Sequence, residues 1–264
     1  MMFLLGLILA FFNLTYGLQC LDNCSMNYSM SQSFILPMNC NRISAYRCSV
    51  KLLFWYDRRN YTVIFNTDSG QDNNYAADNR YFIMIETSKN KFFSYDIHHV
   101  CKESDDCAEQ FAEQKISQMI KRSYNISSLY SNLQRILNDK LALSKNLACF
   151  DMNESVRQCT IPGMYGSCQI IDDLIKHKFY RRLCLQSDRP TASVNIYDSG
   201  SFSMMTVKCN RMLCNGPLTI IEVKKILAHH NITDDYGRIP GRSTQILLNS
   251  YLFILMVIFF FFRI

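Results

Sequence analysis

Residues 49–65 read Ser49-Val-Lys-Leu-Leu-Phe-Trp-Tyr-Asp-Arg-Arg-Asn-Tyr-Thr-Val-Ile-Phe65, and this stretch decides the predicted fold of the first half of the chain. Apolar residues alternate with others at positions 50, 52, 54 and 56, which is the period of a β-strand. Polar residues at 57–60 separate this segment from the β-branched and aromatic run 61–65. Two such runs joined by a short polar turn predict a β-hairpin.

The tip of this hairpin is also the candidate binding edge. Three aromatic residues flank two arginines there: Phe54, Tyr56, Tyr61, Arg58 and Arg59. Exposed aromatic side chains beside arginine are the residue types that dominate protein-binding hot spots. We therefore expect these five residues to bind a partner. Trp55, the single tryptophan, is expected to face the core.

Two further hairpins are predicted along the chain. The first pairs 81–87 with 92–100, and the second pairs 192–197 with 202–208. Each of them delivers the chain to a close pair of cysteines, Cys101 with Cys107 in the first half and Cys209 with Cys214 in the second. This order of hairpin and cysteine pair is the one hint of an internal repeat.

Amphipathic patterns predict helices between and after the hairpins. Helical spacing of apolar residues covers 104–120, 126–145 and 170–183, and a capping box formed by Thr219 and Glu222 opens a last helix to about residue 229. Core packing explains these apolar stripes better than a cofactor groove does. Hairpins combined with such helices predict an α+β fold rich in disulfides.

All 12 cysteines lie between residues 20 and 214: Cys20, Cys24, Cys40, Cys48, Cys101, Cys107, Cys149, Cys159, Cys168, Cys184, Cys209 and Cys214. An even count in an exported chain predicts six disulfides. The spacings lack the Cys-x2-Cys of zinc ribbons and fingers, so we expect no metal site. Six cysteines fall in 20–107 and six in 149–214. If each half closes on itself, about 15 pairings per half remain open.

Both ends of the chain are apolar. Residues 1–17 have the apolar core and the small residues near a cut site that are typical of a secretory signal peptide. Residues 246–262 form a second apolar run, preceded by a polar spacer. Small residues before this spacer predict a lipid anchor attached at Asp235 or, as a second choice, at Gly241. A single-pass helix is the alternative, and release by a phosphatidylinositol-specific phospholipase would distinguish the two.

The predicted organisation follows from these segments. It consists of a signal peptide at 1–17, a cysteine-rich β-hairpin domain at 18–108, a helical hairpin at 109–148, a second cysteine-rich domain at 149–235, a polar spacer at 236–245 and a hydrophobic tail at 246–262. Six Asn-x-Ser/Thr sequons predict N-glycosylation of surface positions: Asn23, Asn27, Asn60, Asn125, Asn153 and Asn231.

Charge and motifs argue against several function classes. The chain carries 28 Lys and Arg against 22 Asp and Glu, and its basic residues are scattered, so we expect no nucleic-acid partner. No sequence motif of a hydrolase, a metalloprotease or a nucleotide-binding loop occurs, so we expect neither catalysis nor a cofactor. One alternative is a secreted hydrolase that uses His98, His99 or His177 with an aspartate. Another is a structural coat protein.

Motifs at the ends of the two cysteine sets resemble those of a known family. Leu18-Gln19-Cys20 directly follows the predicted signal cut, and Cys209-x4-Cys214-Asn215 stands near the end. These motifs resemble the opening Leu-x-Cys-x-x-Cys and the closing Cys-x4-Cys-Asn of the urokinase-receptor-type three-finger (LU-like) family. Residues 101–107 are similar to the same ending, with Ala108 in place of its Asn. The chain also resembles cysteine-rich surface proteins of small invertebrates.

The resemblance implies hairpin fingers that bind protein partners without catalysis. Together with the predicted signal peptide, sequons and tail, it leads us to expect a glycosylated recognition protein on the extracellular side of the plasma membrane. Its expected partner is an extracellular protein or glycan, and its expected membrane contact is the C-terminal tail.

Overall fold

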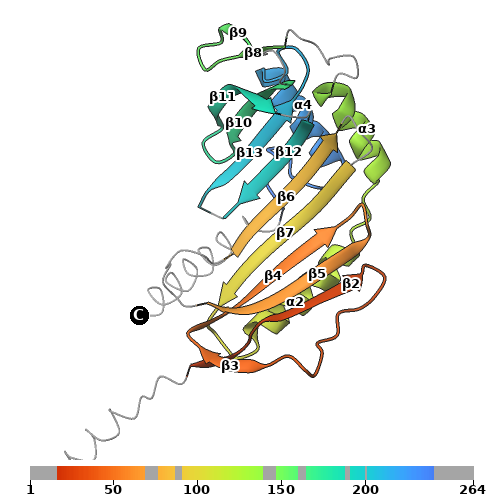
Figure 1. The fold of residues 1–264 in the computed structure, drawn as a ribbon, viewed down its shortest axis with the longest axis vertical. Helices are drawn as coiled ribbons and strands as arrows, with labels where there is room; N and C mark the ends of the chain where they lie inside the picture. Colours follow the sequence, from red (N-terminus) through yellow and green to blue (C-terminus); the bar gives the residue numbers. More distant parts are fainter. Residues whose placement is uncertain are drawn as a thin grey trace, which may run out of the picture. The chain divides into compact units, whose positions relative to one another are not determined.

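The structure is a computed structural model that describes residues 17–68, 77–86, 91–138, 147–159, 165–187, 191–199 and 201–240. The predicted signal peptide apart from Gly17, the predicted tail 246–262 and Gly241 lie outside these residues. The described part contains thirteen strands and three helices (Figure 1). None of its helices is long and apolar enough to cross a membrane.

The chain is mostly β, so the predicted α+β class fits only loosely. The strands are β1 (Leu18–Leu21), β2 (Cys24–Ser29), β3 (Arg42–Ala45), β4 (Arg47–Trp55), β5 (Asn60–Asp68), β6 (Ala77–Glu86), β7 (Lys91–Cys101), β8 (Ala148–Phe150), β9 (Val156–Gln158), β10 (Tyr165–Asp173), β11 (Lys178–Ser187), β12 (Thr191–Asp198) and β13 (Ser203–Cys209). The helices are α2 (Cys107–Ile120), α3 (Ile126–Leu137) and α4 (Pro217–His229). Nine of the strands belong to one large sheet.

The chain divides into two compact units. The first comprises Met1–Phe54, Arg59–Ala77 and Ile97–Arg122, and the second comprises Trp55–Arg58, Asp78–Asp96 and Ser123–Ile264. This division differs from the predicted boundaries at 18–108, 109–148 and 149–235, which follow the order of the cysteines. The predicted helix at 104–120 is present as α2. The one predicted over 126–145 is present as α3 but ends at Leu137, because residue 138 is extended, and residues 139–146 lie outside the described part. Helix α2 groups with the first unit and α3 with the second.

The first unit is built on the predicted hairpin of β4 and β5. Its strands follow the order β7, β4, β5, β2, and β2 pairs antiparallel with β5. Side chains alternate between a buried and a more exposed face, so that Leu52, Val63 and Phe65 are fully buried. One face of α2 is buried in the same unit, and His99 of β7 stacks on Phe111 of α2 with ring centroids 3.9 Å apart.

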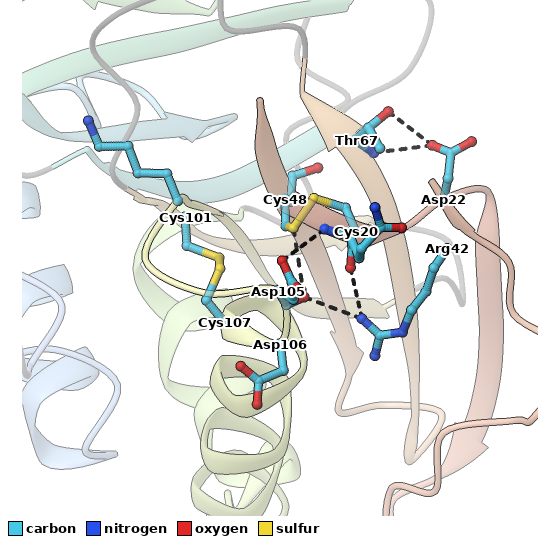
Figure 2. Close-up of a disulfide and its surroundings, with 12 residues drawn as sticks. Cys20, Asp22, Arg42, Cys48, Thr67, Cys101, Asp105, Asp106 and Cys107 are labelled. Carbon is cyan, nitrogen blue, oxygen red and sulfur yellow. Dashed lines mark hydrogen bonds between the residues drawn. A yellow bond between two sulfur atoms is a disulfide. The ribbon is translucent and has the colours of Figure 1, made fainter. Parts of the chain in front are cut away.

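The short loop between Cys101 and Cys107 contacts strand β1 in the first unit (Figure 2). The backbone N–H of Gln19 in β1 donates to Asp105 Oδ1 at 2.9 Å. Arg42 of β3 donates from Nη1 to the carbonyl oxygen of Gln19 at 2.8 Å, and its Nη2 lies 2.5 Å from Glu109 Oε1. The loop thus joins β1, β3 and α2 through polar contacts beside the Cys20–Cys48 disulfide.

The second unit contains the other predicted hairpins, β6 with the first part of β7, and β12 with β13. Its strands follow the order β11, β10, β13, β12, β6, β7. One face of these strands is buried, and its side chains include Ile83, Val194 and Val207, which are fully buried. Helices α3 and α4 supply buried apolar residues to the same unit, among them Leu133 and Leu227.

The predicted helix at 170–183 is wrong, because these residues form the hairpin of β10 and β11. Asp173 terminates β10 by accepting hydrogen bonds from the backbone N–H groups of Ile175 and Lys176 at 3.0 and 2.9 Å. His177 then adopts a positive φ of 51°, which reverses the chain into β11. The helical spacing of apolar residues here is overridden by pairing of β10 with β13.

The short loop between Cys209 and Cys214 is hydrogen-bonded to β8 in the second unit. The backbone N–H of Leu213 donates to the carbonyl oxygen of Ala148 at 2.8 Å. The fully buried Asn215 accepts from the N–H of Phe150 at 2.9 Å and donates to its carbonyl oxygen at 2.7 Å. Each closing loop therefore binds the strand that carries the first cysteine of its own half, Cys20 in β1 or Cys149 in β8.

All 12 cysteines are paired, which confirms the predicted six disulfides. The pairs are Cys20–Cys48, Cys24–Cys40, Cys101–Cys107, Cys149–Cys168, Cys159–Cys184 and Cys209–Cys214. Each pair stays within its own half of the cysteine set. A chain with this many disulfides is typical of extracellular and secreted proteins.

Candidate binding surface

The predicted binding edge is wrong in its aromatic residues. Phe54, Tyr56 and Tyr61 are 0%, 4% and 1% exposed, so they belong to the core and cannot meet a partner. Burial raises the pKa of the Tyr61 hydroxyl to about 12. The reason is the two-residue period of β4, because positions 50, 52 and 54 share the buried face.

Trp55 is partly exposed, as was expected of Phe54 and Tyr56, so the expectation that it faces the core is wrong. It follows Phe54 on β4 and therefore points to the opposite face, where it is partly exposed. The Arg58 guanidinium carbon lies 5.5 Å from the centroid of the Trp55 ring, which is a cation–π contact. Phe92 of β7 also contacts Trp55, edge to face, with centroids 4.7 Å apart.

The same arrangement continues across the next strand. Phe82 of β6 packs edge to face on Phe92 with centroids 5.7 Å apart, and the Arg80 guanidinium carbon lies 5.6 Å from the Phe82 centroid. All five residues belong to the second unit, and none is fully buried. We call this row, Arg58, Trp55, Phe92, Phe82 and Arg80, the aromatic–arginine strip.

Backbone pairing and one turn position the strip. The N–H of Tyr56 donates to the carbonyl oxygen of Phe93 at 3.0 Å, which fixes the end of β4 next to β7. Asp57 Oδ1 accepts from the N–H of Phe93 at 3.5 Å. At the other end, Arg80 Nε donates to Asn195 Oδ1 of β12 at 2.8 Å, which holds the guanidinium beside Phe82.

The strip lies on an open face of the sheet that extends over further strands. Cross-strand neighbours in register run from Phe82 through Asn195, Thr206 and Ile171 to Arg181. Their side chains are partly or fully exposed. On the same face Lys208 neighbours Gln169 and Ser193, and partial burial lowers the pKa of its ammonium group. The second unit therefore presents a face that combines aromatic rings with arginine and lysine.

The strip can bind a partner through two kinds of contact. Its aromatic rings offer apolar area that loses little conformational freedom on binding, and its arginines offer planar donors for carboxylates and other acceptors. Arg58 is 65% exposed, and its Nε lies 3.8 Å from Asp57 Oδ2, so this ion pair is loose and leaves the guanidinium accessible.

Arg58 and Arg59 of the predicted edge belong to different units. Arg58 belongs to the strip, whereas Arg59 groups with the first unit, has a positive φ of 54° and accepts through its carbonyl oxygen a hydrogen bond from the N–H of Met30 at 2.8 Å. Sequence reasoning also missed Phe82, Phe92 and Arg80. The alternation at 50, 52 and 54 could have shown that Trp55 faces away from the core. The predicted hairpin of 81–87 and 92–100 already pairs β6 with β7, but no local signal places β7 beside β4.

The candidate hydrolase residues are divided between the two units. His98 and His99 are neighbours on β7 and so point to opposite faces. His177 belongs to the second unit, in the turn before β11, where its ring lies 5.7 Å from that of Tyr236.

The clusters with metal-ligand spacing among the described residues consist mainly of cysteines. These are Cys149 with Cys159 and Cys184, and Cys101 with Glu103 and Cys107. Every one of these cysteines is in a disulfide, so none offers the thiolate that binds a metal.

All six sequon asparagines are exposed, as glycan attachment requires: Asn23, Asn27, Asn60, Asn125, Asn153 and Asn231. Asn125 caps α3 through Oδ1, which accepts from the N–H of Ser128 at 3.1 Å. The sequence matches no model of a known protein family, and no curated protein is similar to it.

Proposed function

We propose that this protein is a glycosylated extracellular recognition protein without catalytic activity, tethered to the cell surface by its C-terminus. Six disulfides, a predicted signal peptide and six exposed sequon asparagines support export. The observation that carries the recognition role is the aromatic–arginine strip. Three partly exposed rings and two arginines form one row on an open sheet face, where a core role does not explain them.

The position of the last described residues favours Gly241 over Asp235 as the site of lipid attachment. Attachment at Asp235 removes all later residues, yet Ile239 is 7% exposed and Gly237 packs against α4. Gly237 has a φ of 87°, and a Cβ at this position would come within 2.8 Å of Met205. Asp234 also exchanges backbone and side-chain hydrogen bonds with Arg238. An anchor at Gly241 keeps this segment in the fold.

Replacing strip residues is expected to weaken partner binding while leaving the fold intact. Trp55→Ala and Arg80→Ala should each weaken binding by about tenfold or more, because aromatic and arginine residues dominate binding energy at interfaces. The measurement is binding of the mature protein to arrays of extracellular proteins and glycans, followed by affinity determination for each ligand found. The single tryptophan adds a direct readout, since a ligand on the strip should change its fluorescence.

Tyr180→Ala is the matched control for this experiment. Tyr180 is 62% exposed on β11 in the same unit but lies outside the strip, so its removal should leave affinity unchanged. If every ligand binds the Trp55 and Arg80 variants as tightly as the parent protein, the strip is not the binding surface.

A further inference from the structure

The two edge strands of the large sheet differ in how they are protected from pairing with another chain. Strands β2 and β11 occupy the two ends of the strand order. An edge strand presents unpaired backbone groups that can pair with another chain, and charged residues are a common protection. Strand β11 carries the exposed Lys178 and Arg181, whereas β2 reads Cys-Ser-Met-Asn-Tyr-Ser and has neither a charge nor a proline.

Strand β2 instead contains or adjoins three sequons. Asn27 lies in its middle, Asn23 directly precedes it, and Asn60 faces Ser29 across the pairing with β5. All three asparagines are exposed. Among the described residues, β2 has β5 as its only paired neighbour in the sheet. At its end the N–H of Ser29 donates to Gln32 Oε1 at 3.1 Å and the Ser29 carbonyl oxygen accepts from the N–H of Gln32 at 2.9 Å, so the open part of this edge precedes Ser29. The uncharged edge is therefore the place where half of the sequons gather.

The side chain of Asn27 is oriented for a glycan that covers the open edge. Thr62 of β5 donates from Oγ1 to Asn27 Oδ1 at 2.6 Å, and the register places these two residues opposite each other. The oxygen and nitrogen of a planar amide point in different directions. Since Oδ1 takes the bond from Thr62, Nδ2, the atom that carries an N-linked glycan, is not engaged in this contact with β5.

We propose that N-linked glycans at Asn27, Asn23 and Asn60 shield β2 and prevent it from pairing with β2 of a second copy of this chain. An unprotected edge of this kind pairs with its own copy about a twofold axis, because the same surface then serves both partners. The glycans replace the charges that protect β11. This inference rests on the export and glycosylation proposed above.

The test removes the Asn27 sequon without changing Asn27. Ser29→Ala abolishes the sequon, and Ser29→Thr keeps it as the conservative control. Both proteins are produced with the parent in a glycosylating host, their glycans are counted by intact mass, and their molar masses are measured by light scattering at increasing concentration. Ser29→Ala should lose one glycan and at least double its molar mass, whereas Ser29→Thr and the parent stay monomeric.

Two further variants separate the edge from a general effect of glycan loss. Ser127→Ala removes the Asn125 sequon at the start of α3 and leaves the cap from Asn125 to Ser128 in place, so this protein should lose one glycan and stay monomeric. Asn27→Lys removes the glycan but puts a charge on β2, so it should also stay monomeric.

The outcomes distinguish this inference from the proposed function. A parent protein with no glycan on any sequon contradicts both. A parent with its glycans, together with a Ser29→Ala protein that stays monomeric, overturns the shielding role alone. Association of Ser127→Ala or Asn27→Lys to the same extent as Ser29→Ala overturns it as well, because the effect then does not arise at the edge of β2.

Discussion

Replacing Lys224 by methionine is expected to destabilise the second unit by about 3–5 kcal/mol, because one member of a buried ion pair then loses its partner. Lys224 Nζ of α4 lies 2.6 Å from Asp172 Oδ2 of β10, and the two side chains are 16% and 4% exposed. The carboxylate left behind has little access to water. Urea unfolding of the parent and the variant, followed by circular dichroism, measures the difference in the free energy of unfolding.

A double variant and a surface control decide whether the ion pair is the cause. Lys224→Met combined with Asp172→Leu removes both charges and should recover most of the lost stability, since apolar replacement of a buried pair is often neutral or better. Lys176→Met removes a lysine that is 67% exposed and 3.8 Å from Asp173, so it should change stability by no more than about 0.5 kcal/mol. Equal losses in Lys224→Met and the double variant would contradict the ion-pair explanation.

Removing the Cys20–Cys48 disulfide by alanine at both positions is expected to cost about 3.5 kcal/mol. The bridge closes a loop with a sequence separation of 28, and both cysteines are buried. The Cys209–Cys214 bridge spans a separation of only 5, so its removal should cost about 2 kcal/mol by the same loop-entropy argument. Thermal unfolding of the two double-alanine proteins ranks them. The account of the bridges as loop constraints fails if the shorter loop proves the more costly to lose.

The period of two residues predicts the hairpins. The same period also shows which side chains of the predicted binding edge are buried and which are exposed. Alternation at 50, 52 and 54 predicts β4 and equally assigns Trp55 to the opposite face. The expectation that Trp55 faces the core relies on its residue type and ignores its place in the alternation of β4. The place of a residue in the strand determines the face that its side chain takes, because neighbouring side chains of a strand point to opposite faces.

Other features depend on contacts that are distant in sequence. The strip requires β4, β6 and β7 to come together, and Arg80 is held by Asn195, which is 115 residues away in the chain. The helical pattern at 170–183 is a genuine local signal, but the turn capped by Asp173 and the pairing with β13 override it. The even number of cysteines in an exported chain predicts that disulfides form, whereas the choice among pairings follows from the folded strands.

The most direct test of the account is a disulfide map of the mature protein recovered from the surface of expressing cells. We expect six bridges, Cys20–Cys48, Cys24–Cys40 and Cys101–Cys107 in the first half, and Cys149–Cys168, Cys159–Cys184 and Cys209–Cys214 in the second. Non-reducing digestion and mass spectrometry identify each linked pair of peptides. Free thiols, or any bridge between a cysteine of 20–107 and one of 149–214, would contradict the account of an exported protein whose two halves each close on themselves.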